Sequence, residues 1–289
     1  MSMTGLYIPL VTPFDVDGSV AVDALEQLAT ETLDAGARGL VVLGTTGEPA
    51  ALTDDEKHTV VDVASRVCSG RDVSLIVGAN TPAAVTEWGS RDDVTAIMSL
   101  VPPFIRPGEA GVVAYFEHLA TIGDTPLIVY DIPQRTGQYL SADTLRRIGG
   151  IERVVGIKYA PGNMNVDTIL LLADPPTDTA ILGGDDPFMS PLLALGADGA
   201  IAASAHVATA DFVRLIDLWH AGDVARARQL GEKLSRLATS LFTEPNPTVT
   251  KGVLHAQGRI PTAAVRLPLL PATSAHVDEA MLRVAELSV

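Results

Sequence analysis

The sequence predicts an α/β fold, a TIM (β/α)8 barrel with an appended C-terminal helical region. Short apolar runs alternate eight times with longer runs of helical periodicity, which is the pattern of parallel βαβ units. Eight is also the number of strands that closes such a barrel. A chain of 289 residues, of which 47% are hydrophobic, is long enough to form one.

The eight expected strands are short and rich in Val, Ile and Leu, at 6–10, 39–43, 73–77, 95–100, 127–130, 154–158, 180–182 and 199–202. Helices are expected between them at about 22–35, 53–68, 83–89, 107–122, 141–148, 163–173 and 187–195. Thr53 followed by Glu56 is typical of a capping box, and either Asn163 or Asn165 starts its helix. Asp185 or Asp186 is expected to cap the helix after the seventh strand.

No strand pattern returns after residue 207, where helices are expected at about 208–221, 223–241, 245–256 and 274–287. We therefore divide the chain into a barrel, 1–206, and a C-terminal helical region packed on it, 207–289. A doubly wound open sheet is the alternative fold. It needs a glycine-rich phosphate-binding turn after the first strand, and this chain has Thr12-Pro13-Phe14-Asp15 there.

Composition excludes several classes of partner. The net charge of −15 argues against nucleic acid and anionic membranes, because both are bound through clustered Lys and Arg. The only cysteine, Cys68, leaves no internal disulfide and fits a reducing compartment. The N-terminus has no basic signal region, and no apolar run is long enough to cross a bilayer. We expect a cytoplasmic globular protein.

The chain contains only four lysines, and Lys158 closes the sixth apolar strand. An ammonium group at the end of a buried strand loses hydration, which lowers its pKa. A neutral lysine amine attacks carbonyl carbons and forms Schiff bases. Taken alone, this strand slightly favours a structural lysine that pairs with a carboxylate over a catalytic one. The other residues at the same rim are therefore needed to choose between the two interpretations. Lys57 and Lys233 lie on helices and are expected to be solvated.

Polar residues follow several of the strands at their carboxyl ends, where parallel barrels carry their active sites. Thr45 and Thr46 follow the second strand, and Tyr130 ends the fifth. Threonine hydroxyls with nearby N–H groups hold carboxylates, and a tyrosine hydroxyl carries protons. Each residue alone has a structural explanation, as a turn or as packing, but their convergence with Lys158 favours imine chemistry. The same opening is expected to receive Thr12, Phe104, Gly183, Gly184, Asp185, Asp186 and Ser204.

Four ordered motifs resemble those of the dihydrodipicolinate synthase / N-acetylneuraminate lyase family of class I pyruvate-dependent aldolases. They are Gly44-Thr45-Thr46-Gly47-Glu48, Tyr130-Asp131-Ile132-Pro133-Gln134-Arg135-Thr136-Gly137, Gly156-Ile157-Lys158 and Gly183-Gly184-Asp185-Asp186. The similarity runs nearly end to end and includes Glu244-Pro245-Asn246-Pro247. It implies a TIM barrel with a C-terminal helical region that assembles as a homo-oligomer, usually a tetramer, with a dimer left open.

The resemblance also implies residue roles and partners. Lys158 would form the Schiff base with pyruvate, Tyr130 and Thr45 would belong to the proton relay, and the pyruvate carboxylate would be held at Thr45 and Thr46. Further substrate contacts are expected at Gly184 and Ile201. The partners are then a 2-keto acid and an aldehyde, and neither a metal nor an organic cofactor is expected.

Arg135 resembles the synthase branch of the family, in which an arginine at this place binds the carboxylate of aspartate semialdehyde. A guanidinium suits that bidentate task, although an arginine here also fits a surface or interface ion pair. The stretch 244–247 is similar to the synthases as well. The expected reaction is therefore a condensation of pyruvate with aspartate semialdehyde, as in 4-hydroxy-tetrahydrodipicolinate (dihydrodipicolinate) synthases.

The sequence departs from the synthases at several positions. Phe104 stands where they carry a relay tyrosine that reaches into the neighbouring subunit, and a phenyl ring passes no proton. The helix at 83–89 is shorter than usual, and Asp54 and Lys57 replace histidines of the lysine-feedback site, so no lysine feedback is expected. Tyr159 follows the Schiff-base lysine, where an acid is frequent, and is expected to narrow the pocket.

These departures leave two alternatives open. One is a paralogous aldolase or dehydratase that acts on another 2-keto acid, such as a 2-keto-3-deoxy sugar acid. The other is a barrel that binds a keto acid as a sensor without catalysis, although the presence of both Lys158 and Tyr130 argues against it. His206 is assigned to the structure of a helix start, because neither a metal partner nor a catalytic triad is evident.

Overall fold

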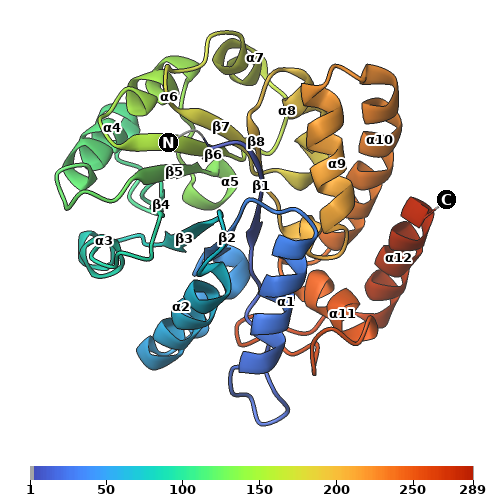
Figure 1. Cartoon of the computed structure of the whole chain (residues 1–289). Coiled ribbons are helices and arrows are strands. Elements are labelled where there is room, and N and C mark those ends of the chain that lie inside the picture. The colour runs from blue at the N-terminus through green and yellow to red at the C-terminus, as the bar shows by residue number, and fades with distance from the viewer. Residues whose placement is uncertain (1–2, 289) are drawn as a thin grey trace.

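The predicted barrel is present in the computed structural model, which describes residues 3–288 (Figure 1). The strands pair in parallel in sequence order, and β8 pairs with β1 to close the barrel. The strands are β1 (Gly5–Pro9), β2 (Gly39–Val42), β3 (Ser74–Gly78), β4 (Ala96–Leu100), β5 (Leu127–Asp131), β6 (Val154–Tyr159), β7 (Ala180–Gly183) and β8 (Gly199–Ile201). The TIM-barrel prediction is confirmed.

Helices follow the strands and surround the barrel (Figure 1). They are α1 (Val22–Asp34), α2 (Asp54–Cys68), α3 (Pro82–Gly89), α4 (Gly108–Leu119), α5 (Pro133–Thr136), α6 (Ala142–Gly149), α7 (Val166–Ala173), α8 (Met189–Ala194) and α9 (Thr209–His220). Short 3-10 helices are η1 (Thr45–Gly47), η2 (Pro49–Ala51), η3 (Asp186–Phe188), η4 (Ala203–His206) and η5 (Glu286–Ser288). The one-turn helix α5 was not predicted, because four residues are too few to show a period.

The C-terminal region adds α10 (Val224–Leu241), α11 (Thr248–Ala256) and α12 (Ser274–Ala285) on one side of the barrel (Figure 1). Helix α10 packs on α8 and α9, and α12 packs on α10 and α11. Lys233 is half-buried, and its ammonium donates to the Glu286 carbonyl at 2.9 Å. Helix α9 lies after residue 206, but it follows β8 and contacts β1 of the barrel. The division of the chain into two parts at residue 206 therefore stays a prediction.

Alternate strand residues fill the interior of the barrel, as the two-residue period of a strand requires. These inward side chains form a separate buried cluster, which includes Tyr7, Val41, Ile76, Met98, Ile128, Tyr130, Leu182 and Ile201. A Cβ on Gly199 would lie 2.1 Å from the Gly5 carbonyl oxygen. Only glycine therefore lets β8 approach β1 closely enough to close the barrel.

Two of the three predicted helix starts are correct. Thr53 and Glu56 form the capping box of α2, with the Thr53 N–H donating to Glu56 at 2.8 Å. Asn165, not Asn163, caps α7 through a 2.9 Å bond from the Thr168 N–H. The third prediction was wrong, since neither Asp185 nor Asp186 caps a helix with its side chain. Their carboxylates instead accept N–H groups from the loops after β6 and β8, at Gly162 and Ser204.

Other predictions about single residues hold. Burial raises the pKa of the Cys68 thiol to about 11, as expected of inert packing. His206 accepts from the Val11 N–H at 3.1 Å, and burial lowers its pKa to about 4, so it serves the structure. Lys57 pairs on the surface with Asp54 at 2.9 Å. Among residues 3–288, no helix is long and apolar enough to cross a membrane.

Candidate active site

Lys158 and Tyr130 face each other at the carboxyl end of the barrel. Strands β5 and β6 pair in a register that places Tyr130 opposite Lys158, and such partners point to the same face of a parallel sheet. The Lys158 Nζ lies 4.2 Å from the centre of the Tyr130 ring. Both side chains are buried, with exposed fractions of 6% and 7%. The structure thus brings together the two residues on which the imine hypothesis depends.

The environment of Lys158 favours its neutral amine. Burial lowers the pKa of Lys158 to about 8, and the nearby Arg135 guanidinium lowers it further, while Asp186 and Asp185 oppose the shift. Within residues 3–288 Lys158 forms no ion pair, so the purely structural explanation loses its main support. A buried lysine of this pKa carries a useful fraction of free amine near neutral pH.

Asp186 supplies the negative charge beneath this site. It is 3% exposed and accepts from the Ser204 N–H at 2.6 Å. Burial raises the pKa of Asp186 to about 6, against the lowering effects of the Ser204 bonds and the Lys158 charge. Asp186 acts on Lys158 through its charge, and its expected place at the opening of the barrel, together with Ser204, stays a prediction.

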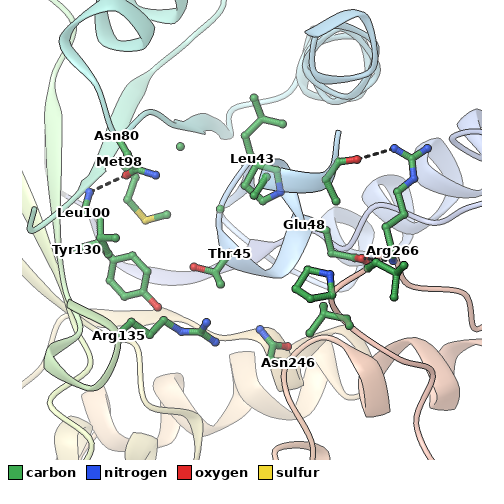
Figure 2. A pocket seen from close by; sticks show the side chains of 18 residues that line it. Leu43, Thr45, Glu48, Asn80, Met98, Leu100, Tyr130, Arg135, Asn246 and Arg266 are labelled. Carbon is green, nitrogen blue, oxygen red and sulfur yellow. Dashed lines mark hydrogen bonds between the residues drawn. The ribbon is translucent and has the colours of Figure 1, made fainter. Parts of the chain in front are cut away.

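A cavity of about 250 Å³ opens beside Tyr130 (Figure 2), and the residues that line it do not include Lys158, Thr46, Gly184 or Ile201. Thr45, Tyr130 and Arg135 line one part of it, and Figure 2 shows their polar ends turned toward one another. Burial raises the pKa of Tyr130, whereas Arg135 and the Thr45 hydroxyl lower it. A phenol held neutral next to an amine and a second hydroxyl is suited to passing protons. The cavity wall also contains the apolar side chains of Leu43, Met98, Leu100, Leu267 and Leu269.

Gly184 makes room for the lysine side chain. A Cβ at this position would lie 2.9 Å from the Lys158 Cγ and 3.0 Å from its Cε, closer than carbon atoms approach without contact strain. Any larger residue would displace the amine. Ile201, the other expected substrate contact, is fully buried in the interior cluster of the barrel.

The turn after β2 is held in place by the C-terminal region. The Thr46 hydroxyl is 3% exposed and accepts from the Asn246 Nδ2 at 3.0 Å, whereas Thr45 borders the cavity. Thr45 and Thr46 open η1, and N–H groups in the first turn of a helix lack acceptors within it. The Thr12 hydroxyl donates to the Gly47 carbonyl at 2.8 Å. The turn therefore presents the Thr45 hydroxyl, which lies next to Tyr130, and the first N–H groups of η1 from a fixed backbone.

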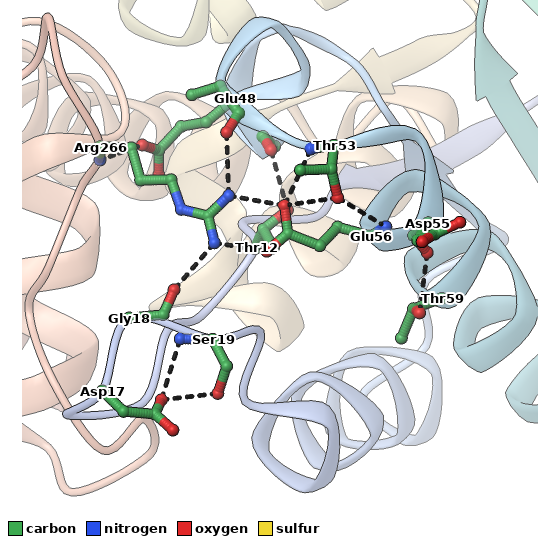
Figure 3. A network of polar contacts seen from close by, with 12 residues as sticks. Thr12, Asp17, Gly18, Ser19, Glu48, Thr53, Asp55, Glu56, Thr59 and Arg266 are labelled. Atoms are coloured by element: carbon green, nitrogen blue, oxygen red, sulfur yellow. Dashed lines mark hydrogen bonds and ion pairs between the residues drawn. The ribbon is translucent and has the colours of Figure 1, made fainter.

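Glu48 anchors the end of this turn through contacts that sequence reasoning missed. Its carboxylate binds the Lys251 Nζ at 2.8 Å, with both side chains at most 2% exposed. It also accepts from the backbone N–H of Arg266 at 2.8 Å. The Arg266 guanidinium in turn donates hydrogen bonds to Glu56 and to the Gly18 carbonyl (Figure 3). The only signal in the sequence that pointed to Lys251 was that the chain contains just four lysines.

Two residues expected at the rim do not line the cavity. Phe104 is 90% exposed and has a φ of 69°, and its expected place at a relay position that reaches toward a neighbouring subunit stays a prediction. Tyr159 does not narrow the cavity either, since its hydroxyl lies 3.0 Å from the Thr168 hydroxyl on the outside of the barrel. Tyr159 follows an inward-facing lysine, and successive strand residues point to opposite faces.

A sequence profile of the Dihydrodipicolinate synthetase family matches residues 2–286. The chain belongs to this family. It is 34% identical over 283 residues to 4-hydroxy-tetrahydrodipicolinate synthase 1 of Halalkalibacterium halodurans, covering 95% of this chain and 94% of that one. It is 35% identical over 268 residues to the synthase of Moorella thermoacetica, covering 91% of each.

Solved structures of the dihydrodipicolinate synthetase family agree with the assignment. The dihydrodipicolinate synthase of Thermotoga maritima superposes with a TM-score of 0.94 at 28% identity, covering 100% of this chain and 99% of that one. The chloride-inhibited enzyme of Acinetobacter baumannii, complexed with pyruvate, gives 0.92 at 30% identity and covers all of both chains. The protein is therefore an enzyme of the dihydrodipicolinate synthase type, a class I lyase, and the resemblance stated from the motifs is confirmed.

Proposed function

We propose that the protein condenses pyruvate with aspartate semialdehyde through a Schiff base on Lys158. The observation that carries this proposal is the buried pair of Lys158 and Tyr130 beside a cavity bordered by Thr45 and Arg135. The names of the relatives support it, since those compared above are dihydrodipicolinate synthases. They favour this reaction over a different 2-keto acid and over a sensor.

The first chemical step is imine formation. The neutral Lys158 amine attacks the keto carbon of pyruvate, and the resulting carbinolamine loses water to leave a C=N bond. Tyr130 takes up the proton released by nitrogen and returns one to the departing hydroxyl. Loss of a proton from the methyl carbon, which is assigned to Tyr130, then gives an enamine. The enamine carbon attacks the aldehyde carbon, the aldehyde oxygen takes up the proton as the new C–C bond forms, and water finally releases the product from Lys158. Each step uses a group already placed at the mouth of the barrel.

The pyruvate carboxylate is assigned to the turn at Thr45 and Thr46. The turn supplies the Thr45 hydroxyl and the first N–H groups of η1, and charge-assisted bonds of this kind hold carboxylates well. The Thr46 hydroxyl is occupied by Asn246, so its role is to fix the turn. Gly184 contributes by leaving space for the Lys158 chain.

Arg135 is assigned to the carboxylate of the second substrate. It borders the cavity and, within the described part of the chain, makes no ion pair that would occupy its guanidinium. A planar guanidinium binds a carboxylate through two parallel hydrogen bonds. An aldehyde that carries a carboxylate therefore fits this cavity better than a neutral one.

The proposal also includes the assembly of the protein as a homo-oligomer and its location in the cytoplasm. A homo-oligomer, a tetramer or a dimer, is supported by Phe104 and Ile105, two neighbouring apolar side chains that are 90% and 80% exposed. Exposed apolar residues at the rim suit contact with a second copy. A cytoplasmic location is inferred from the single cysteine.

The reaction is tested by steady-state turnover of pyruvate with aspartate semialdehyde and with uncharged aldehydes of similar length. Wild-type enzyme should turn over aspartate semialdehyde with the higher kcat/KM. Arg135→Ala should lower kcat/KM for aspartate semialdehyde by about 10- to 100-fold and leave the uncharged aldehydes little changed. Arg147→Ala, an exposed arginine on α6, is the matched control. Absence of turnover of aspartate semialdehyde by wild-type enzyme would overturn the assignment.

A further inference from the structure

A second set of polar residues lies on the outer face of the barrel, behind the catalytic strands. Asp131 follows Tyr130 on β5 and pairs in register with Tyr159 on β6. Because strand residues alternate between faces, Asp131 points away from the barrel interior. It is 2% exposed, and its Oδ1 has no hydrogen-bond partner among the described residues. A buried carboxylate without a donor is costly and calls for an explanation.

Asp131 borders a separate cavity of about 170 Å³, which we call the Asp131 pocket. Its lining residues come from β5, β6 and the segments that lead into α4, α6 and α7, and they are Glu109, Asp131, Pro133, Tyr139, Leu140, Ser141, Tyr159, Pro161, Asn165 and Asp167. The pocket has room for roughly five water molecules. It shares no lining residue with the catalytic cavity.

The charge in this pocket is negative and incompletely balanced. Glu109 accepts from the Ser141 N–H at 2.5 Å and Asp167 from the Ala142 N–H at 3.1 Å, so both are stabilised by the start of α6. Asp131 receives no such donor within residues 3–288. No Lys or Arg is among the lining residues. A cation would balance this charge when Asp131 is ionised.

We propose that the Asp131 pocket binds the ammonium group of a small primary amine. An ammonium carries three donors, and the residues that line the pocket include three with acidic side chains, Asp131, Glu109 and Asp167, and Tyr159 with its hydroxyl. The rest of the wall, formed by Pro133, Leu140, Pro161 and the Tyr139 ring, suits a short alkyl chain.

A metal ion fits the pocket less well. In the part of the chain that the structure describes, no three His, Cys, Asp or Glu side chains are close enough to hold one together. Ca²⁺ and Mg²⁺ bind oxygen ligands at about 2.0–2.6 Å, whereas an N–H···O hydrogen bond spans about 2.7–3.2 Å. An anion is excluded by the three carboxylates. The geometry therefore selects an organic cation.

The Asp131 pocket lies directly behind the catalytic pair on the same two strands. Asp131 and Tyr159 directly follow Tyr130 and Lys158 on the same two strands. Burial raises the pKa of Asp131 to about 7, and the Asp185 charge adds to the shift. Asp185 also acts on the pKa of Lys158. An amine bound at Asp131 would thus add a positive charge behind the catalytic pair.

Binding is tested with propylammonium chloride as the probe and thermal unfolding as the measurement, which needs no turnover. Propylammonium at saturating concentration should raise the Tm of the wild-type protein by about 2–4 °C relative to sodium chloride at equal ionic strength. Propan-1-ol has the same length without the charge, and tetramethylammonium has the charge without N–H donors; neither should raise the Tm. These comparisons use only the unaltered protein.

Two variants locate the effect. Asp131→Asn keeps the shape of the side chain and removes its charge, so the propylammonium shift should disappear. Asp92→Asn removes an exposed carboxylate beyond the end of α3, and the shift should remain. The proposal is overturned if propylammonium leaves the wild-type Tm unchanged, if tetramethylammonium matches it, or if Asp131→Asn retains the full shift.

Discussion

The Lys158 amine lies against the Tyr130 ring, with its Nζ 4.2 Å from the ring centre. The contact joins the ends of two neighbouring strands, because β5 and β6 are paired in register at these residues. It places a nucleophile and a proton carrier in one buried site, and both residues lie on strands and not on loops. Sites built on strands hold their geometry more closely than sites built on loops.

The pH dependence of catalysis should report the amine. Burial lowers the pKa of Lys158 to about 8 from an ordinary value of 10.5, so the neutral form appears at lower pH than in a free lysine. We expect kcat/KM for pyruvate to rise with pH and to level off above an apparent pKa of about 8. Initial rates at subsaturating pyruvate measure it. A rise that continues to an apparent pKa near 10.5 would contradict this environment for Lys158.

Removal of the Tyr130 hydroxyl should slow chemistry more than binding. Tyr130→Phe keeps the ring that packs on Lys158 and deletes only the group assigned to proton transfer, so kcat should fall by about 10²–10⁴-fold. KM for pyruvate should change much less. Tyr139→Phe, at an exposed tyrosine outside the catalytic cavity, serves as the control. Equal kcat values for Tyr130→Phe and wild type would remove Tyr130 from the mechanism.

The ion pair of Lys251 and Glu48 should contribute to stability through the turn that it holds. Both side chains are buried, and removal of one partner leaves an uncompensated charge. Lys251→Met should therefore lower the free energy of unfolding by about 3–5 kcal/mol, as measured by urea denaturation. Lys57→Met, in the surface pair with Asp54, should cost less than about 1 kcal/mol. Similar losses in the two variants would show that burial of the pair has no special effect.

The unpaired carboxylate of Asp131 predicts a stability difference that grows with pH. Its pKa is raised from 3.8 to about 7 in the folded protein, so wild-type protein loses stability as pH rises through this interval, while the neutral Asn does not ionise. Relative to wild type, Asp131→Asn should gain about 2–4 kcal/mol in unfolding free energy between pH values below and above this interval. Urea denaturation at both ends measures it. A constant difference would mean that Asp131 titrates normally.

Most of the fold was predictable because its signals are local. Apolar runs, glycine positions and pairs such as Thr53 with Glu56 lie within a few residues of one another. Lys158 and Tyr130 were found for a similar reason, since both end a strand and such ends meet at one rim. The family motifs then assigned their roles.

The remaining contacts depend on the packed fold. Asn246 bonds to Thr46 across 200 positions of the chain, and Lys251 reaches Glu48 across 203, so neither contact leaves a periodic signal. Asp131 belongs to the family motif at 130–137, but its burial on the outer face of the barrel depends on the register of the strands. The contacts of Thr46 and Glu48 thus depend on the packing of the C-terminal region against the barrel.

Trapping of the imine tests the central claim most directly. Wild-type enzyme incubated with pyruvate and sodium borohydride should gain the mass of one reduced pyruvyl group, and peptide mass spectrometry should place it on Lys158. Lys158→Arg should gain none, because a guanidinium does not form the imine. Absence of the adduct from wild-type enzyme, or its location on Lys57, Lys233 or Lys251, would contradict the account.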